Sequence, residues 1–289
     1  MCRTDIARTE NRMKKIIEKY TLLYCVVIGI VVLGAMMGCG TLIERLFRDT
    51  GVDGYVVMAL QELCGAILAM AAMRISGCIK VLTERGIGLG KGLLVGGYFL
   101  FVGVYSAILY LVMFEGEKVL RPWYLIAAFL ICMFLVGVTE EILCRGIIAE
   151  LLCRRYGASS RGVWKAVIIS GVIFGLLHAS NMLSAEPSGV IVQIVLAGMM
   201  GMTFAAIYFR SGNIWVVVCL HAFVDISALI TTGLYGGSLV DTISGYEFGR
   251  LVGVVPYIIV IAVLLRKKKM KQIVARLEET YERDARLES

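Results

Sequence analysis

Charge is scarce in this sequence. Asp, Glu, Lys and Arg together make up 18% of its 289 residues, whereas 59% of the residues are hydrophobic and the mean hydropathy is +0.83. A soluble domain of this length could not bury so much apolar surface, so the composition excludes a water-soluble globular protein. It predicts an integral membrane protein, for which the bilayer is the solvent.

Charge is missing altogether from two long runs, residues 20–43 and 92–114. About 20 helical residues cross the hydrocarbon core of a bilayer, so each run is long enough to span it. Six further apolar runs hold or adjoin few charges, namely 54–73, 122–139, 166–181, 188–209, 211–230 and 246–265. The predicted fold class is therefore all-α, a polytopic membrane helix bundle with about eight transmembrane helices.

Lys and Arg are rare in every second loop between these runs. Most of them fall in the segments 3–19, 74–91, 154–165 and 266–271, and few in the loops between those segments. Because cytoplasmic loops hold the excess of Lys and Arg, this pattern predicts that both termini lie in the cytoplasm. The net charge of +7 comes largely from these segments, so it indicates attraction to anionic lipid headgroups and not nucleic-acid binding.

Linkers and repeats are also lacking. The chain has 3 prolines, no Ser-rich or low-complexity tract and no internal repeat. We predict one transmembrane domain over residues 1–265 and a basic cytoplasmic tail over residues 266–289. Ile273, Leu277 and Tyr281 recur in the tail at helical spacing, which predicts a helix lying at the headgroups; a solvated tail is the alternative.

Several familiar motifs are absent. The nine cysteines form no paired framework and no CxxC pair, so we interpret them as small core residues. The glycine-rich stretch 84–92 has no Ser or Thr after Lys91, which excludes a Walker nucleotide-binding loop, and no HExxH helix indicates a zincin-type metalloprotease. Glycines spaced by four predict close helix packing. They are Gly92 with Gly96, and Gly171 with Gly175.

Against this apolar background, the stretch "FLVGVTEEILCRGIIAE" at residues 134–150 carries two adjacent carboxylates. Ionisable groups inside membrane spans are costly, so each is a candidate functional residue. Glu141 and Arg145 lie four residues apart on one helix face, in the right order for an ion pair, while Glu140 points about 100° away. We predict that Glu141 is structural and that Glu140 is free for chemistry.

The chain has only two histidines, and both fall within predicted spans. His178 ends "FGLLH", and His221 begins "HAFVD", where Asp225 follows one turn later on the same face. Helix rise puts Glu140, His178, His221 and Asp225 roughly 20, 21, 12 and 18 Å from the cytoplasmic ends of their helices. We therefore expect these four side chains to line one cavity in the cytoplasmic half of the membrane.

Such a cavity suits hydrolysis. A carboxylate in it can act as a general base that takes a proton from water, a role that fits Glu140. The imidazoles allow two alternatives. Glu140, His178 and His221 could bind a metal ion, with Zn²⁺ as the natural choice. Alternatively, the two histidines and Asp225 could stabilise the oxyanion of a peptide carbonyl under attack.

The motifs EExxxR in "EEILCR", FxxxH in "FGLLH" and HxxxD in "HAFVD", in this order, resemble those of the CPBP family. This family, also called Abi, comprises type II CAAX prenyl endopeptidases and bacteriocin-processing or immunity proteins. The resemblance covers roughly residues 120–230. It implies an intramembrane protease of a bacterial cell membrane, acting on a membrane-associated peptide or protein.

The resemblance also implies a role for each motif residue. Glu140 would activate the hydrolytic water, Glu141 with Arg145 would support the site, and His178, His221 and Asp225 would complete it. Both metal-dependent and metal-independent glutamate proteases are described in the family, so Zn²⁺ stays open as a cofactor. Eukaryotic members are expected to have Asn where this chain has Asp225. An ionised Asp would repel an oxyanion, so that role requires Asp225 to be protonated or next to a metal.

Two other functions fit parts of the pattern. A non-catalytic immunity or scaffolding protein of the same fold would keep the spans but would not need Glu140. A transporter or proton relay would use Glu62, which lies in the run 54–73 and has no role in the protease hypothesis. A transporter is also expected to have broken helices and inverted repeats, and the sequence shows no sign of either.

Overall fold

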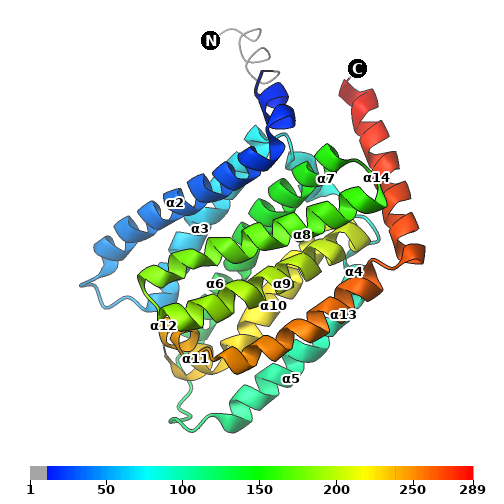
Figure 1. Ribbon diagram of the computed structural model, residues 1–289. Coiled ribbons are helices and arrows are strands. Elements are labelled where there is room, and N and C mark those ends of the chain that lie inside the picture. Colours follow the sequence, from blue (N-terminus) through cyan, green and yellow to red (C-terminus); the bar gives the residue numbers. More distant parts are fainter. Residues whose placement is uncertain (1–11, 238, 289) are drawn as a thin grey trace.

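The computed structural model describes residues 12–237 and 239–288, which form a bundle of helices (Figure 1). No strand occurs in these two ranges, so the all-α prediction is confirmed. The beginning of α2 and the C-terminal helix α14 lie at the same end of the bundle in Figure 1. The short helices α11 (Ile230–Tyr235) and α12 (Leu239–Ser244) lie at the opposite end.

Five continuous helices are long and apolar enough to cross a membrane. They are α2 (Thr21–Phe47), α3 (Gly54–Ile75), the helix Trp123–Tyr156, the helix Ser160–Leu183 and α9 (Pro187–Ser211). Two bent pairs raise the number to as many as seven. These pairs are α4 (Leu89–Val95) with α5 (Gly97–Met113), and η4 (Phe248–Gly253) with α13 (Val254–Leu264) followed by α14 (Lys267–Glu288).

The predicted number of about eight spans is therefore higher than the five to seven that the described residues support. The predicted span 211–230 accounts for one difference, because it forms the 15-residue helix α10 (Ile214–Ala228), which is short for a membrane crossing. Each predicted run nevertheless coincides with a helix or with a bent helical segment, as expected where hydropathy alone drives insertion.

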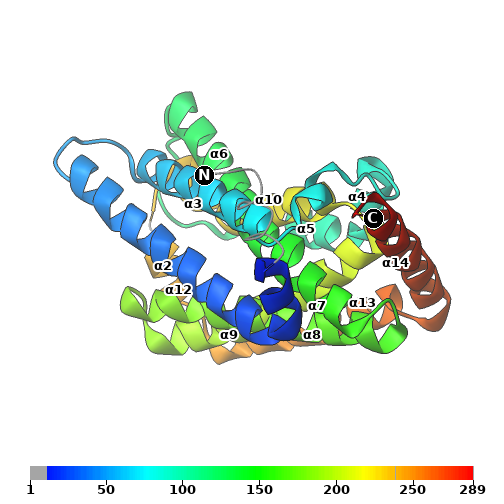
Figure 2. The ribbon, with the colours of Figure 1, turned by 90° about the horizontal axis from the view of Figure 1, so that it is seen from above.

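Seen from above, the helices form two layers (Figure 2). One layer contains α3, α6 (Trp123–Glu141), α10 and α5, and the other contains α8 (Ser160–Leu177), α9 and α13. α2 packs on α3 and reaches α8 at the edge of both layers. In the most apolar 18-residue stretch of α2, only 17% is buried within the protein, against 56% in the corresponding stretch of α9. α2 therefore faces lipid, and α9 is central.

Glycines bring neighbouring helices into close contact, as predicted. A Cβ atom on Gly175 of α8 would lie 2.5 Å from the backbone oxygen of Ile194 in α9. A Cβ atom on Gly96, next to α4, would lie 2.2 Å from a methyl group of Leu220 in α10. Gly171 and Gly92 are equally crowded. A larger residue at Gly171 or Gly175 would meet backbone atoms of α9, so these two positions hold α8 close to α9, whereas Gly92 and Gly96 face side chains of α10.

The helix Trp123–Tyr156 changes its winding after Glu141. Residues Ile142–Ala149 (η2) form a π-helix, and α7 (Glu150–Tyr156) resumes the α-helix. All eight residues of η2 are buried. π-Helical segments are rare and are frequent at functional sites, and the hydrophobic pattern of this stretch did not predict one. η2 sets the direction of Arg145 relative to the two glutamates.

The C-terminal tail is a helix, α14, as its pattern predicted, but its apolar face does not lie on lipid headgroups. Met270, Ile273 and Leu277 are buried against the bundle. The Arg276 guanidinium donates hydrogen bonds to the carbonyl groups of Phe209 and Arg210, which would otherwise be unpaired at the C-terminal end of α9. Protein contacts therefore replace the predicted lipid contact of this face.

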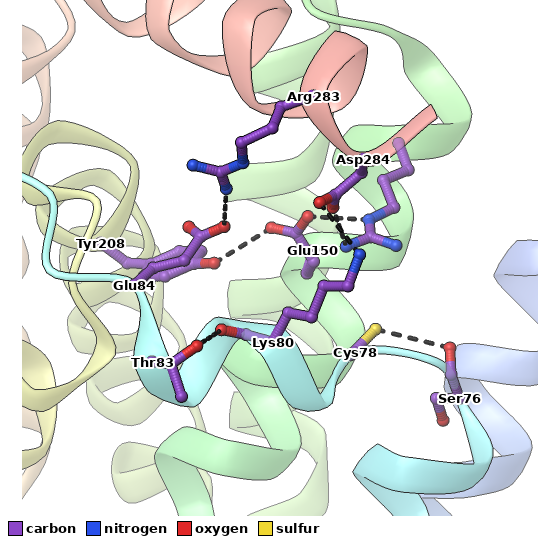
Figure 3. Close-up of polar contacts among 10 residues, drawn as sticks. Ser76, Cys78, Lys80, Thr83, Glu84, Glu150, Tyr208, Arg283 and Asp284 are labelled. Carbon is purple, nitrogen blue, oxygen red and sulfur yellow. Dashed lines mark hydrogen bonds and ion pairs between the residues drawn. The ribbon is translucent and has the colours of Figure 1, made fainter. Parts of the chain in front are cut away.

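Ion pairs join α14 to two further elements, as Figure 3 shows. Asp284 pairs with Lys80 of η1 (Ile79–Thr83) at 3.2 Å and with Arg154 of α7 at 3.9 Å, and Arg283 pairs with Glu84, directly after η1, at 3.4 Å. Beneath them, the buried Glu150 of α7 accepts hydrogen bonds from Arg154 at 2.8 Å and from the Tyr208 hydroxyl of α9 at 3.0 Å. α14 thus ties the loop after α3 to α7 and α9.

We expect Arg276→Ala to lower the unfolding temperature measured in detergent, because the carbonyl groups of Phe209 and Arg210 at the end of α9 lose their hydrogen-bond donor. A lost hydrogen bond to a buried group costs about 1–3 kcal/mol. The matched control is Lys271→Ala, an exposed residue on the same helix. Equal unfolding temperatures for the two variants would contradict the capping role of Arg276.

Candidate active site

A buried ion pair stands at the centre of the site. Glu141 and Arg145 are 0% and 1% exposed, and Nη1 of Arg145 donates to Oε1 of Glu141 at 2.7 Å, as predicted from their spacing. Nη2 of Arg145 donates to the carbonyl oxygen of Gly201 in α9 at 2.9 Å. The guanidinium also lies 4.5 Å from the ring centre of Phe174 in α8. Arg145 therefore connects α6, α8 and α9.

His221 of α10 is held by the same carboxylate. Its Nδ1 lies 2.7 Å from Oε1 of Glu141, and the side chain is 3% exposed. A carboxylate oxygen that already accepts a bond from Arg145 can only accept again, so Nδ1 of His221 carries the proton. Glu141 thus fixes the tautomer and direction of the ring, as a carboxylate commonly does for a functional histidine.

The other ring nitrogen of His221 faces two acids. Nε2 lies 3.6 Å from Oε2 of Glu140 and 3.5 Å from Oδ2 of Asp225. The Glu140 side chain is 31% exposed, yet its Oε2 is buried and has no hydrogen-bond partner among the described residues. Asp225 is 23% exposed and lies one turn after His221, as predicted. Glu140 therefore accepts no hydrogen bond from the described residues, whereas Oε1 of Glu141 accepts two, from Arg145 and His221.

His178 lies slightly apart from this group. It follows the last residue of α8, and its Nδ1 lies 2.9 Å from the carbonyl oxygen of Phe174. In the part of the chain that the structure describes, no hydrogen bond or ion pair joins His178 to Glu140 or His221. The ring of Phe174 contacts both histidines, with its centre 4.9 Å from that of His178 and 6.0 Å from that of His221.

Phe174 was not among the predicted site residues, although it is the first residue of the FxxxH motif. Its ring contacts Arg145 and both histidines, and its carbonyl group orients His178. The four-residue spacing puts Phe174 one helical turn before His178, which explains why an aromatic residue and a histidine occur together there.

The sequence was compared with known families and proteins. Residues 122–227 match the family model described as "Type II CAAX prenyl endopeptidase Rce1-like". This segment resembles an Rce1-like domain. The match confirms the resemblance inferred from the three motifs, and it includes Glu140, His178, His221 and Asp225. No curated protein and no solved structure matches the chain.

The Rce1-like domain of this chain does not hold a ready metal site. Among the described residues, no group of three or more His, Cys, Asp or Glu side chains is arranged to hold a metal ion. The predicted ligands Glu140, His178 and His221 are not assembled, because no hydrogen bond or ion pair among the described residues joins His178 to the other two. The geometry therefore gives no basis for a reaction step through Zn²⁺.

Proposed function

We propose that the protein is an intramembrane endopeptidase that hydrolyses a peptide bond of a membrane-associated protein or peptide. The Rce1-like domain and the apolar helices support this function at the level of the family. One observation supports the specific mechanism. Glu140 has a buried carboxylate oxygen without a hydrogen-bond partner, next to a histidine whose ring is held by the neighbouring Glu141.

In the proposed reaction, Glu140 takes one proton from a water molecule as the water oxygen bonds to the carbonyl carbon of the substrate. The carbonyl π electrons move to its oxygen and form a tetrahedral oxyanion. When this intermediate collapses, the C–N bond breaks and Glu140 returns the proton to the leaving nitrogen. Glu140 is thus first a general base and then a general acid, and it ends in its starting state.

The negative charge of the oxyanion has to be stabilised by hydrogen-bond donors. We propose that Nε2 of His221, once protonated, is one donor, because Glu141 and Arg145 hold the ring in a fixed direction. Nε2 of His178 is the proposed second donor. Because Nδ1 of that ring donates its hydrogen to the Phe174 carbonyl oxygen, Nε2 donates only when the ring is protonated, as for His221. We assign Asp225 to the orientation of His221 and not to oxyanion contact, because an ionised carboxylate would repel the oxyanion.

The proposed location is a bacterial cell membrane, with both termini in the cytoplasm. The described ends of the chain lie at one end of the bundle, where the basic segments gather, in line with this orientation. Lys267, Lys268 and Lys271 are exposed there, and we propose that they contact anionic lipid headgroups. In a bacterium, leader peptides, pheromone precursors or membrane-anchored proteins are better substrate candidates than prenylated CAAX proteins.

Comparative proteomics tests the function directly. Membrane-associated peptides would be compared between cells that express the wild-type protein and cells that express Glu140→Gln. The matched control is Glu117→Gln, which changes an exposed loop carboxylate in the same way. We expect one or more cleavage products in the wild type and the control that are missing with Glu140→Gln. Identical peptide sets in all three samples would overturn the proposal.

Metal removal gives a separate prediction. Because the candidate ligands are not assembled, we expect the purified protein to keep its cleavage activity in an excess of EDTA and 1,10-phenanthroline. Element analysis of the same sample would measure bound Zn²⁺. Stoichiometric zinc, together with a loss of activity in chelator that added Zn²⁺ restores, would instead make the protein a metalloprotease.

A further inference from the structure

Glu62 of α3 is an acidic residue inside the membrane that lies outside the Rce1-like domain. Its Oε2 atom is buried and has no hydrogen-bond partner among the described residues. α3 packs against α6, the helix that carries Glu140. Glu62 therefore lies on a helix next to the candidate active site, although it comes from a different part of the chain.

The backbone places α3 against the residue that precedes Glu140. Oγ1 of Thr139 donates a hydrogen bond to the carbonyl oxygen of Glu62 at 3.2 Å. The two helices lie close together there: a Cβ atom on Gly65 would be only 3.1 Å from the methyl group of Thr139. This contact sets the backbone of Glu62 against the turn of α6 that carries Thr139 and Glu140.

Two buried carboxylate oxygens without partners, on adjacent helices, are energetically unfavourable inside a membrane. They are Oε2 of Glu62 and Oε2 of Glu140; a third such oxygen, Oε2 of Glu141, belongs to the carboxylate that already accepts from Arg145 and His221 through Oε1. Both are acceptors, so the natural shared partner is a group with two hydrogen atoms to donate. A water molecule is such a group, and buried waters commonly bond otherwise unpaired polar atoms.

We propose that Glu62 is a water-positioning residue of the active site, which together with Glu140 accepts the two hydrogen bonds of the hydrolytic water. This inference rests on the proposed function. With both hydrogen atoms held, a lone pair of the water oxygen is directed at the carbonyl carbon of the substrate. Glu140 removes one proton during attack, while Glu62 keeps its hydrogen bond to the other and exchanges no proton. The site then extends beyond residues 122–227 to α3.

The test measures kcat and KM for Glu62→Leu and Glu62→Gln on a synthetic fluorogenic peptide that contains the cleavage site found by proteomics. Losing a hydrogen bond to a charged acceptor corresponds to a rate decrease of about 10- to 100-fold. We expect this loss in kcat for Glu62→Leu, with little change in KM. Glu62→Gln keeps one acceptor oxygen and should recover part of the rate.

The matched control is Gln61→Leu on the same helix, since the Gln61 amide donates to the carbonyl of Gly40 in α2 and not to the site. It should keep the wild-type kcat. Wild-type kcat for Glu62→Leu would overturn the inference, as would equal rates for Glu62→Leu and Glu62→Gln. If Glu62→Leu does not fold, a wild-type kcat for a folded Glu62→Gln would overturn it as well. A peptide that Glu140→Gln also cleaves would refute the proposed function itself, independently of Glu62.

Discussion

Replacing Glu140 with Gln is expected to abolish cleavage and to leave the folded yield unchanged. Loss of a general base typically lowers the rate about 10²- to 10⁴-fold. Stability should not fall, because Oε2 of Glu140 has no hydrogen-bond partner among the described residues and the side chain is 31% exposed. The measurements are kcat on the fluorogenic peptide and the unfolding temperature of the purified protein in detergent.

Glu117→Gln is the control for the charge change, and it should match the wild type in both measurements. Full biological activity of Glu140→Gln would point to the other function weighed from the sequence, a non-catalytic immunity or scaffolding protein. In that case the helices and the Glu141–Arg145 pair would still be needed, but a free carboxylate at residue 140 would not.

Breaking the Glu141–Arg145 pair is expected to cause a large loss of folded protein, in contrast to Glu140→Gln. Removing one partner of a buried ion pair leaves an uncompensated charge and costs about 3–5 kcal/mol. Arg145→Ala also removes the bond to Gly201 and the contact with Phe174. We therefore expect a much lower yield of monodisperse protein and a lower unfolding temperature for Arg145→Ala and Glu141→Gln than for Glu140→Gln.

The double variant Glu141→Met/Arg145→Leu separates stability from catalysis. Replacing both charges by apolar side chains of similar size often restores stability, so the folded yield should recover. Activity should not recover, because Nδ1 of His221 loses its acceptor and the ring is no longer oriented. If the double variant were as active as the wild type, Glu141 would have no role in holding His221.

The features that the sequence predicted are local ones. Long apolar runs identify helices because hydropathy decides insertion, and a four-residue spacing identifies the Glu141–Arg145 and His221–Asp225 neighbours because it equals about one helical turn. Closely packed glycines such as Gly175 were also predictable from spacing alone. Each of these depends only on residues within a single helix.

The missed features depend on contacts between distant parts of the chain. The bond between Glu141 and His221 joins residues 80 positions apart, and no pattern indicates which of two adjacent glutamates a histidine will meet. The apolar face of α14, with Ile273 at its centre, has the same periodicity whether it covers protein or lipid. The involvement of Glu62 likewise depends on the contact of α3 with Thr139.

The π-helix Ile142–Ala149 lies between two polar groups on one continuous helix, Glu140 with Glu141 before it and Glu150 with Arg154 after it. Wider turns use more residues per revolution, so this segment sets the rotational phase between the two groups. Deleting a single residue from it would turn everything that follows by about 100° and move Glu150 away from Tyr208. The π-helix thus acts as a spacer, through which one continuous helix presents acids both to the interior of the bundle and to the end at which α14 lies.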